Sequence, residues 1–345
     1  MKIKLIPSEE GSGVFIKRGT PLKRITLAAG DQPMGLWLPR YESASIQKLI
    51  SRGLVSTLEL ESADFLQTRA EIQDLCKALG TAAIFRSFAR DITRAIEREH
   101  SGARGAEAPY DERNVTVLRA LLAPLREGKR SRLETGAALL KSLPVEQKRR
   151  IHTLVRSDGS GRMMNSLREL LRRSADRADI PEYLALVVLE LVNSVQIQTM
   201  HDFAVRTHLS EETIRKLFQD PDARAKIRTR MEHAGETNAI TWSFSNGNVH
   251  GSRASRMTIT MTGSGTKMRT TSAGVRQQRG VSVEGKSLKD FYEEIAAAGG
   301  VGIDLGLYYL SYLEKLCRQA DIRFETHATE LRGGEKTMVG VRLYV

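Results

Sequence analysis

The sequence predicts an α+β protein with a mainly helical middle, a small N-terminal β-containing cap and a C-terminal α/β two-layer sandwich. Short apolar runs separated by Gly, Pro and Asp fill roughly the first 45 residues, as in small sheets. Apolar residues then recur at helical spacing as far as Ala234. After Gly235 the chain changes to Thr, Ser and Gly with alternating apolar residues, which is typical of strands. Its 345 residues, 41% of them hydrophobic, suffice for more than one domain.

We expect three regions: a β-containing cap at 1–45, a helical region at 46–175, and an α/β domain at 176–345 that carries a helical insertion at 201–234. In the cap, strands are expected at 2–6, 13–17, 25–28 and 34–38. The helical pattern begins at Ile46 and runs through Leu54 and Leu58. Further helices of this region are expected at 63–97, 115–125, 132–143, 145–155 and 163–174.

The third region should begin with helices and end with strands. Helices are expected at 180–204 and 209–234, followed by a hairpin of strands at 240–244 and 256–261. A Gly-rich, basic and mobile loop is expected at 262–280. The remaining elements are expected to be helices at 288–298 and 305–320 and strands at 322–326 and 337–344.

Composition limits the function classes. The formal net charge of +12 and pI of about 9.8 favour an anionic partner, such as a nucleotide, nucleic acid or acidic protein. Cys76 and Cys317 lie too far apart in sequence for a cysteine-based metal site, and they indicate a reducing, cytoplasmic location. The sequence has no HExxH, GxSxG or P-loop motif. No apolar run is long enough to span a bilayer, so we expect no membrane insertion.

Glycines before the last expected helix form the most informative motif. The segment GGVGIDLGL contains Gly300, Gly302, Asp304 and Gly306. Glycines let the backbone approach a phosphate, and a helix N-terminus favours negative charge. Together with the order helix, hairpin, Gly-rich loop, helix, strand, strand, this segment resembles the GHKL superfamily, which includes histidine kinases, gyrase and MutL-like proteins. The resemblance covers roughly 175–345 and implies a nucleotide-binding domain with ATP and Mg2+ as ligands.

Other residues extend the resemblance and also depart from it. LELVNS at 189–194 resembles the helix whose Asn helps to hold magnesium, which implies Glu190 and Asn193 as site residues and Asn193 as the metal ligand. Gly263 and Gly265 resemble the first glycine box, DxGxG, but Met261 stands where that box has its adenine-binding Asp. Asp304 stands at a usual glycine, where it would repel a phosphate unless a metal ion intervenes or the side chain caps the following helix.

The expected function is therefore regulatory or signalling: a degenerate, histidine-kinase-like domain that binds a nucleotide or a protein partner. Autokinase activity is not expected, because His152 lacks the acidic residue that follows a phosphoacceptor histidine. Whether the chain is an enzyme is left open.

A nucleic-acid-binding regulator is the alternative. Residues 201–232 resemble a helix-turn-helix, with Ala204 before the turn and Ile214 after it, and with Arg215 and Lys216 in position to contact phosphates. Glu211 and Glu212 at the start of the second helix oppose this interpretation. A stripe of Arg86, Arg90, Arg94 and Arg98 is a further polyanion candidate, although neighbouring acids favour a salt-bridged surface.

Overall fold

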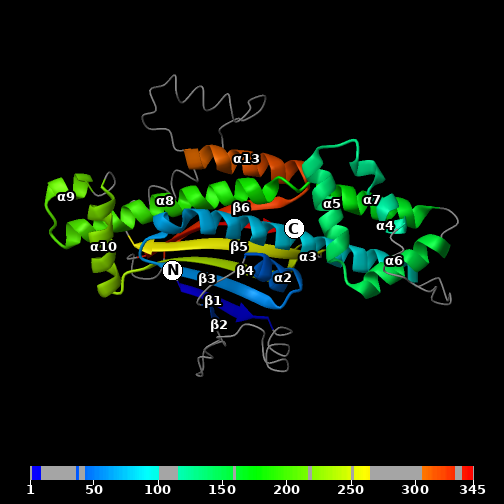
Figure 1. Ribbon diagram of the computed structural model, residues 1–345, viewed down its shortest axis with the longest axis horizontal. Helices are drawn as coiled ribbons and strands as arrows, with labels where there is room; N and C mark the ends of the chain where they lie inside the picture. Colours follow the sequence, from blue (N-terminus) through cyan, green and yellow to red (C-terminus); the bar gives the residue numbers. More distant parts are fainter. Residues whose placement is uncertain are drawn as a thin grey trace, which may run out of the picture.

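The computed structural model describes residues 2–8, 36–38, 43–100, 116–157, 161–216, 220–249, 252–264, 305–330 and 336–344. These residues contain one seven-stranded sheet in the order β2-β1-β3-β4-β5-β7-β6, in which every neighbouring pair is antiparallel (Figure 1). The strands are β1 (Lys2–Pro7), β2 (Leu36–Leu38), β3 (Val55–Ser62), β4 (Asn238–Val249), β5 (Ser252–Ser264), β6 (Arg323–Glu330) and β7 (Lys336–Tyr344). The predicted α+β class is confirmed.

The N-terminal and C-terminal strands share this sheet. β3 pairs with β4 from Thr57 opposite Ser243 to Ser62 opposite Asn238. β1 pairs with β3 on the other side and with β2 beyond it. The hydrogen-bonded ladder therefore crosses the region boundaries expected near residues 45 and 175. The strands expected at 13–17 and 25–28 lie outside the described residues.

The helix expected through Leu54 and Leu58 is wrong, because Val55–Ser62 is the strand β3. Leu58 and Leu60 are fully buried, whereas Glu59 and Glu61 are only half-buried. This alternation has the period of two that a strand requires when one of its faces covers a core. Helix α2 (Ser43–Ser51) ends before it, and the turn that follows carries Gly53 in the left-handed region.

Three long helices pack around the sheet: α3 (Arg69–His100), α8 (Ile180–Arg206) and α13 (Leu305–Gln319). α3 and α8 contact each other and β5, and α13 lies along the other side of α8 (Figure 1). Their apolar faces and the inward residues of the strands form the main core, which includes Trp242, Ile259 and Leu313. At the crossing of α3 and α8, a Cβ on Gly80 would lie 3.1 Å from Pro181, so the small residue permits the close approach.

A second core forms a helical lobe, which consists of the C-terminal half of α3 and the helices between it and α8. These helices are α4 (Thr116–Leu121), η2 (Ala123–Leu125), α5 (Arg130–Ser142), α6 (Val145–Ser157) and α7 (Arg162–Ala175). Phe88, Leu139 and Ile151 are among its buried residues. The Gln147 amide ties α6 to α3, donating to Thr93 Oγ1 at 2.6 Å. The helices expected in this stretch are confirmed.

The helix expected at 209–234 is divided. α9 (Glu211–Lys216) is short, and α10 (Pro221–His233) begins anew, with Asp220 as N-cap accepting from the Asp222 N–H at 2.9 Å. A third apolar cluster holds α10 to the end of α8, through contacts such as those of Ile227 and Met231 with Met200 and Phe203. In Figure 1 this pair of helices and the helical lobe lie at opposite ends of the molecule.

Among the described residues, one helical stretch, Arg162–Arg206, is long and apolar enough to cross a membrane by length and composition. In its most apolar window, 59% is buried inside the fold. Within that stretch α8 has α3 on one side, α13 on the other and β5 beneath it. These contacts bury much of the apolar surface of α8 inside the protein.

Candidate functional site

Helices α8 and α13 lie side by side and run in opposite directions (Figure 1). The rings of Tyr183 and Tyr312 stack with their centroids 6.0 Å apart. Arg177, just before α8, is close enough to Asp321, just after α13, for their charges to interact. Burial lowers the pKa of Arg177, and Asp91 and Asp321 oppose that shift. The start of α8 thus meets the end of α13.

This arrangement brings predicted site residues together. On α8, Glu190 lies seven residues after Tyr183. On α13, Gly306 in the first turn lies about as many residues before Tyr312. Each of these two separations corresponds to about 10 Å along its helix. The start of α13 is therefore beside the Glu190–Asn193 turn of α8. Glu190 and Asn193 are half-buried and share one helix face, outside the apolar core.

Gly263 belongs to the same end of the sandwich. It lies near the end of β5, opposite Thr337, and the preceding Thr262 pairs with Ala239 of β4. Asn238, next to Ala239, donates to Gln196, one turn from Asn193 on α8. Gly265, Gly300, Gly302 and Asp304 lie outside the described residues.

Met261 occupies the position where the resemblance expects the adenine-binding carboxylate. Its side chain is 1% exposed and packs in the main core, with Ile240 and Val339 as its strand partners. A thioether is a weak hydrogen-bond acceptor and has no charge. This position therefore offers no carboxylate to an adenine amino group.

A buried polar cluster of Gln196, Thr199 and Asn238 lies next to these residues. Gln196 is fully buried; its Oε1 accepts from the Phe65 N–H at 3.1 Å, and its Nε2 donates to the Ala63 carbonyl at 2.6 Å. The same Oε1 accepts from Asn238 Nδ2 at 3.1 Å, and the Thr199 hydroxyl lies 3.0 Å from Asn238 Oδ1. The cluster joins α8 to the end of β3 and the start of β4.

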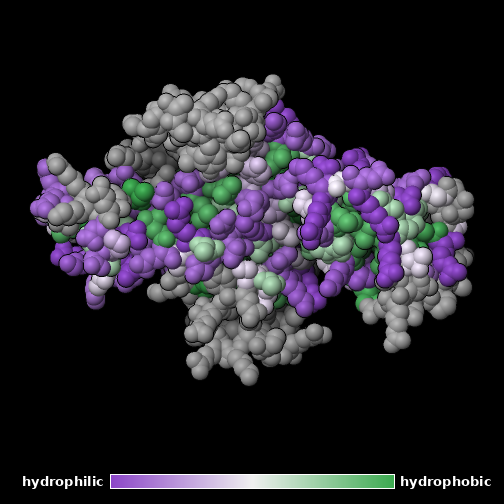
Figure 2. Space-filling model, turned by 45° about the horizontal axis from the view of Figure 1, so that its top comes forward, coloured by the Kyte–Doolittle hydropathy of each residue, from purple (hydrophilic) through white to green (hydrophobic). Residues whose placement is uncertain are grey.

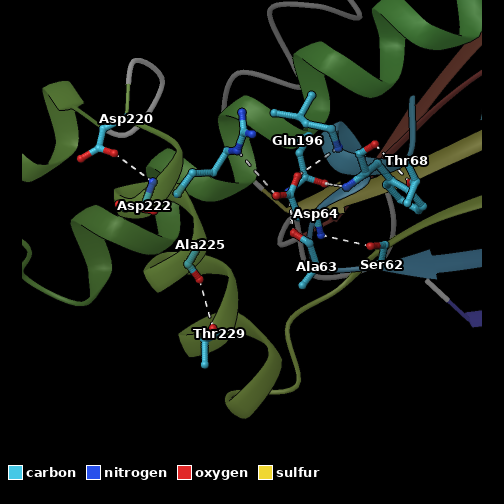
Figure 3. Close-up of polar contacts among 12 residues, drawn as sticks. Ser62, Ala63, Asp64, Thr68, Gln196, Asp220, Asp222, Ala225 and Thr229 are labelled. Carbon is cyan, nitrogen blue, oxygen red and sulfur yellow. Dashed lines mark hydrogen bonds and ion pairs between the residues drawn. The ribbon is translucent and has the colours of Figure 1, made fainter. Parts of the chain in front are cut away.

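Asp64 continues this polar region toward α10. Figure 3 shows Asp64 and Gln196 approaching the same turn from different elements. The Asp64 carboxylate has no exposed surface; its Oδ1 accepts from the Leu66 N–H at 3.0 Å and its Oδ2 lies 3.7 Å from Arg224 Nε. Burial raises the pKa of Asp64, while the Leu66 N–H and the charges of Arg224 and Arg228 oppose the rise. Asp64 Oδ2 and Arg224 Nε have no hydrogen-bond partner in the described part of the protein.

Sequence reasoning missed Asp64, Gln196 and Asn238. A usable signal was present for Gln196, which falls between Val192, Val195 and Met200 on the apolar face of a long helix. A polar residue at such a position requires a buried hydrogen-bond partner. Asn238 has no comparable local signal, because its partners come from another element.

The sequence offered two candidate segments for nucleic-acid binding, residues 201–232 and the arginine stripe of α3. α9 has six residues, fewer than two helical turns, and α10 turns Ile227 and Met231 into the third cluster. In the arginine stripe of α3, Arg90 and Arg94 lie 3.4 and 3.8 Å from Asp91 Oδ1, as a salt-bridged surface would have them. Within the described ranges, no group of three or more His, Cys, Asp or Glu side chains is placed to hold a metal ion.

Comparison with known proteins yields relatives without an assigned activity. The chain is 24% identical to an uncharacterized protein of Treponema pallidum (strain Nichols), across 98% of this chain and 96% of that protein. No solved structure matches the chain. Residues 1–99 and 145–345 match a family of unknown function, DUF8084, and the unmatched stretch contains α4, η2 and α5. Because the match covers most of the sequence, the chain belongs to the family of unknown function DUF8084.

Proposed function

We propose that the sheet with α8 and α13 is a degenerate nucleotide-binding domain of the GHKL type, and that the protein uses it in regulation or signalling. The observation that carries the proposal is the meeting of the Glu190–Asn193 turn with the start of α13. Because α8 and α13 are antiparallel, helix-terminal N–H groups and the Asn193 amide lie at the same end of the fold.

The element order supports the same proposal. α8, β4, β5, α13, β6 and β7 occur along the chain in the order expected from the resemblance, with α9 and α10 inserted between α8 and β4. β5 ends at Ser264 and α13 begins at Leu305, so the glycine segments connect these two elements. Gly263, near the end of β5, and Gly306, at the start of α13, therefore lie on either side of the connection between these two elements.

The ligand should be recognised by its anionic groups rather than by its base. Met261 supplies no carboxylate for an adenine, whereas the N-terminus of a helix of 15 residues favours negative charge. Asn193 would hold Mg2+ through its amide oxygen, and the ion would supply positive charge to offset that of the phosphates. We therefore expect the site to discriminate poorly between adenine and guanine nucleotides.

Calorimetric titration of the full chain with ATP and GTP, each with Mg2+, tests this function. We expect saturable binding of both nucleotides with dissociation constants within a few-fold of each other. Asn193→Ala should weaken binding about 10-fold or more, because it removes a magnesium ligand. Asn165→Ala is the matched control, since Asn165 is an exposed helical asparagine of the helical lobe.

Metal dependence separates the role of Asn193 from a general effect on folding. In EDTA the wild-type affinity should fall to that of Asn193→Ala in Mg2+, and the variant should respond little to EDTA. Nucleotide binding by wild type and Asn193→Ala with equal affinity would exclude Asn193 from the site. Failure of the wild type to bind either nucleotide at millimolar concentration would contradict the nucleotide-binding proposal.

A further inference from the structure

The helical lobe carries most of the chain's excess positive charge. Residues 116–179 contain 15 Lys and Arg and 7 Asp and Glu, which amounts to eight of the net charge of +12. Twelve of the fifteen cations are arginines, which bind phosphate bidentately. Figure 2 shows hydrophilic residues over much of this end of the molecule, with apolar residues between them.

Four of these cations have no ion-pair partner in the part of the chain that the structure describes. Arg119, Arg126, Lys141 and Arg156 are exposed, and none of them forms an ion pair with another described residue. Each of them lies in or just after the last turn of a helix. Arg119, Lys141 and Arg156 lie in the last turns of α4, α5 and α6, and Arg126 directly follows η2. A cation in the last turn of a helix also stabilises that helix slightly, so exposure alone does not decide its role.

Four other arginines of the lobe are held in a repeated pattern. EQKRR at 146–150 and ELLRR at 169–173 each place one glutamate between two arginines. Glu146 pairs with Arg149 at 3.4 Å and Arg150 at 3.1 Å, and Glu169 pairs with Arg172 and Arg173, both at 2.8 Å. Two guanidinium groups therefore share each carboxylate, and Arg172 also pairs with Asp176 at 3.2 Å.

The composition of the lobe distinguishes between anionic partners. Residues 116–179 contain no Phe, Tyr or Trp, and Phe85 and Phe88 of α3 pack in the second core, so the lobe offers few rings on which an unpaired base could stack. Among the described residues of the lobe, Val145 is the one large apolar side chain that is well exposed. A membrane-surface helix would instead present a broad apolar face. Regularly spaced phosphates of a duplex require neither feature.

We propose that the helical lobe binds the phosphate backbone of double-stranded nucleic acid, without reading its sequence, through Arg119, Arg126, Lys141 and Arg156. Three of these four residues lie in the stretch outside the family match, so this binding is an addition in this chain to the shared fold. The site is separate from the α8–α13 end and does not depend on nucleotide binding there. It is also separate from α9 and α10, which lie at the opposite end of the molecule (Figure 1).

Fluorescence anisotropy with a labelled 25-base-pair duplex of arbitrary sequence, at several NaCl concentrations, tests the proposal. The wild type should bind with a steep salt dependence. Substituting the four residues with Gln should weaken binding about 10-fold or more at 0.1 M NaCl and lower the slope of log K against log[NaCl] by about 3 to 4. None of these substitutions breaks an ion pair with a described residue, so the thermal midpoint should change little.

The matched control removes the same charge elsewhere. Lys48, Arg52, Lys226 and Arg230 are also exposed cations without ion pairs among the described residues, two near α2 and two on α10. Their substitution with Gln should change the affinity less than about three-fold. An equal loss of affinity in both variants would show a response to overall charge and would overturn the proposal. A larger loss of affinity in the control would place the binding surface outside the lobe and would also overturn it.

Two further ligands complete the test. A single strand of the same length should bind more weakly than the duplex, and tighter binding of the single strand would overturn the duplex assignment. Vesicles with 30% phosphatidylserine should not compete with the duplex. Binding of such vesicles without binding of duplex at 50 mM NaCl, or binding of neither, would also overturn the proposal.

Discussion

The imidazole ring of His327 lies directly over Gly340, its partner across the β6–β7 ladder. A Cβ built on Gly340 would lie 2.7 Å from His327 Cε1, and it would also overlap the backbone carbonyl oxygen of Ile259 on the neighbouring strand β5. A side chain at 340 would therefore force three strands apart. Burial lowers the pKa of His327, and the charge of Arg342 lowers it further while that of Glu325 opposes the shift, so the fold favours the neutral ring.

Gly340→Ala should destabilise the protein by about 1–3 kcal/mol, because the new methyl group overpacks the sheet. The midpoint of urea unfolding measures the change. Gly128→Ala is the control, since a Cβ at Gly128 would meet its neighbours at ordinary contact distances of 3.5 and 3.7 Å. A Gly340→Ala protein as stable as the wild type would mean that β7 can move away from His327 and β5.

Asn238→Ala should cost about 1–3 kcal/mol. The change leaves the buried Thr199 hydroxyl without its Asn238 partner and removes one donor from Gln196 Oε1. Asn238→Asp should be at least as damaging, because its side chain would bury a negative charge against Gln196 Oε1. Chemical denaturation of both variants, compared with Asn165→Ala, provides the measurement, and equal stability of all three would contradict the assigned network.

Arg224→Ala should destabilise the protein more at pH 7 than at pH 4. The pKa of Asp64 is raised in the folded state above 3.8, so at pH values between the two pKa values the folded state holds more protons and stability falls as the pH rises. Arg224 opposes this loss by stabilising the ionised carboxylate. Without Arg224 we expect a cost of about 1–3 kcal/mol at pH 7, reduced by the partial exposure of the guanidinium.

Asp64→Asn provides the matched background for that experiment. Its amide oxygen can still accept from the Leu66 N–H, so the N-cap is kept while the buried charge is removed. In this background Arg224→Ala should cost less, and the cost should not depend on pH between 4 and 7. The same pH dependence in both backgrounds would assign the effect to a group other than Asp64.

Cys76 and Cys317 should react slowly with thiol reagents in the native protein. Both are fully buried and form no disulfide; burial raises the pKa of each thiol, that of Cys317 to about 12. A thiol reacts as its thiolate, so access and ionisation are both suppressed. We expect two thiols to react with Ellman's reagent in urea and fewer than 0.1 within minutes in buffer. Rapid native reaction of either would show local opening of α3 or α13.

The sequence predicted the helices well because their apolar faces are local patterns. α8 is apolar on nearly every side since α3, α13 and β5 all cover it, and its predicted range differs from the observed one by two residues at one end. β3 was mistaken for helix because Leu54 and Leu58 have the four-residue spacing of a helix, while Leu58 and Leu60 have the two-residue spacing of a strand. Only the pairing with β1 and β4 decides between them.

For the site, the sequence indicated Glu190, Asn193, Gly263 and Gly306, and these four lie at one end of the sandwich. It did not indicate Asp64, Gln196 or Asn238, because a buried polar group is recognised by partners that are distant in sequence. Asp64 and Asn238 flank the β3–β4 ladder, which joins strands about half a chain length apart. No local pattern encodes such a pairing.

The β3–β4 ladder also constrains how the protein is made on the ribosome. β3 emerges well before β4, so one of its edges stays without this hydrogen-bonding partner while about 180 further residues are made. The nascent N-terminal strands therefore present an open edge that could pair wrongly with another chain. Chaperone binding to β1–β3 during translation, or rapid formation of α3 beside them, would protect that edge until β4 arrives.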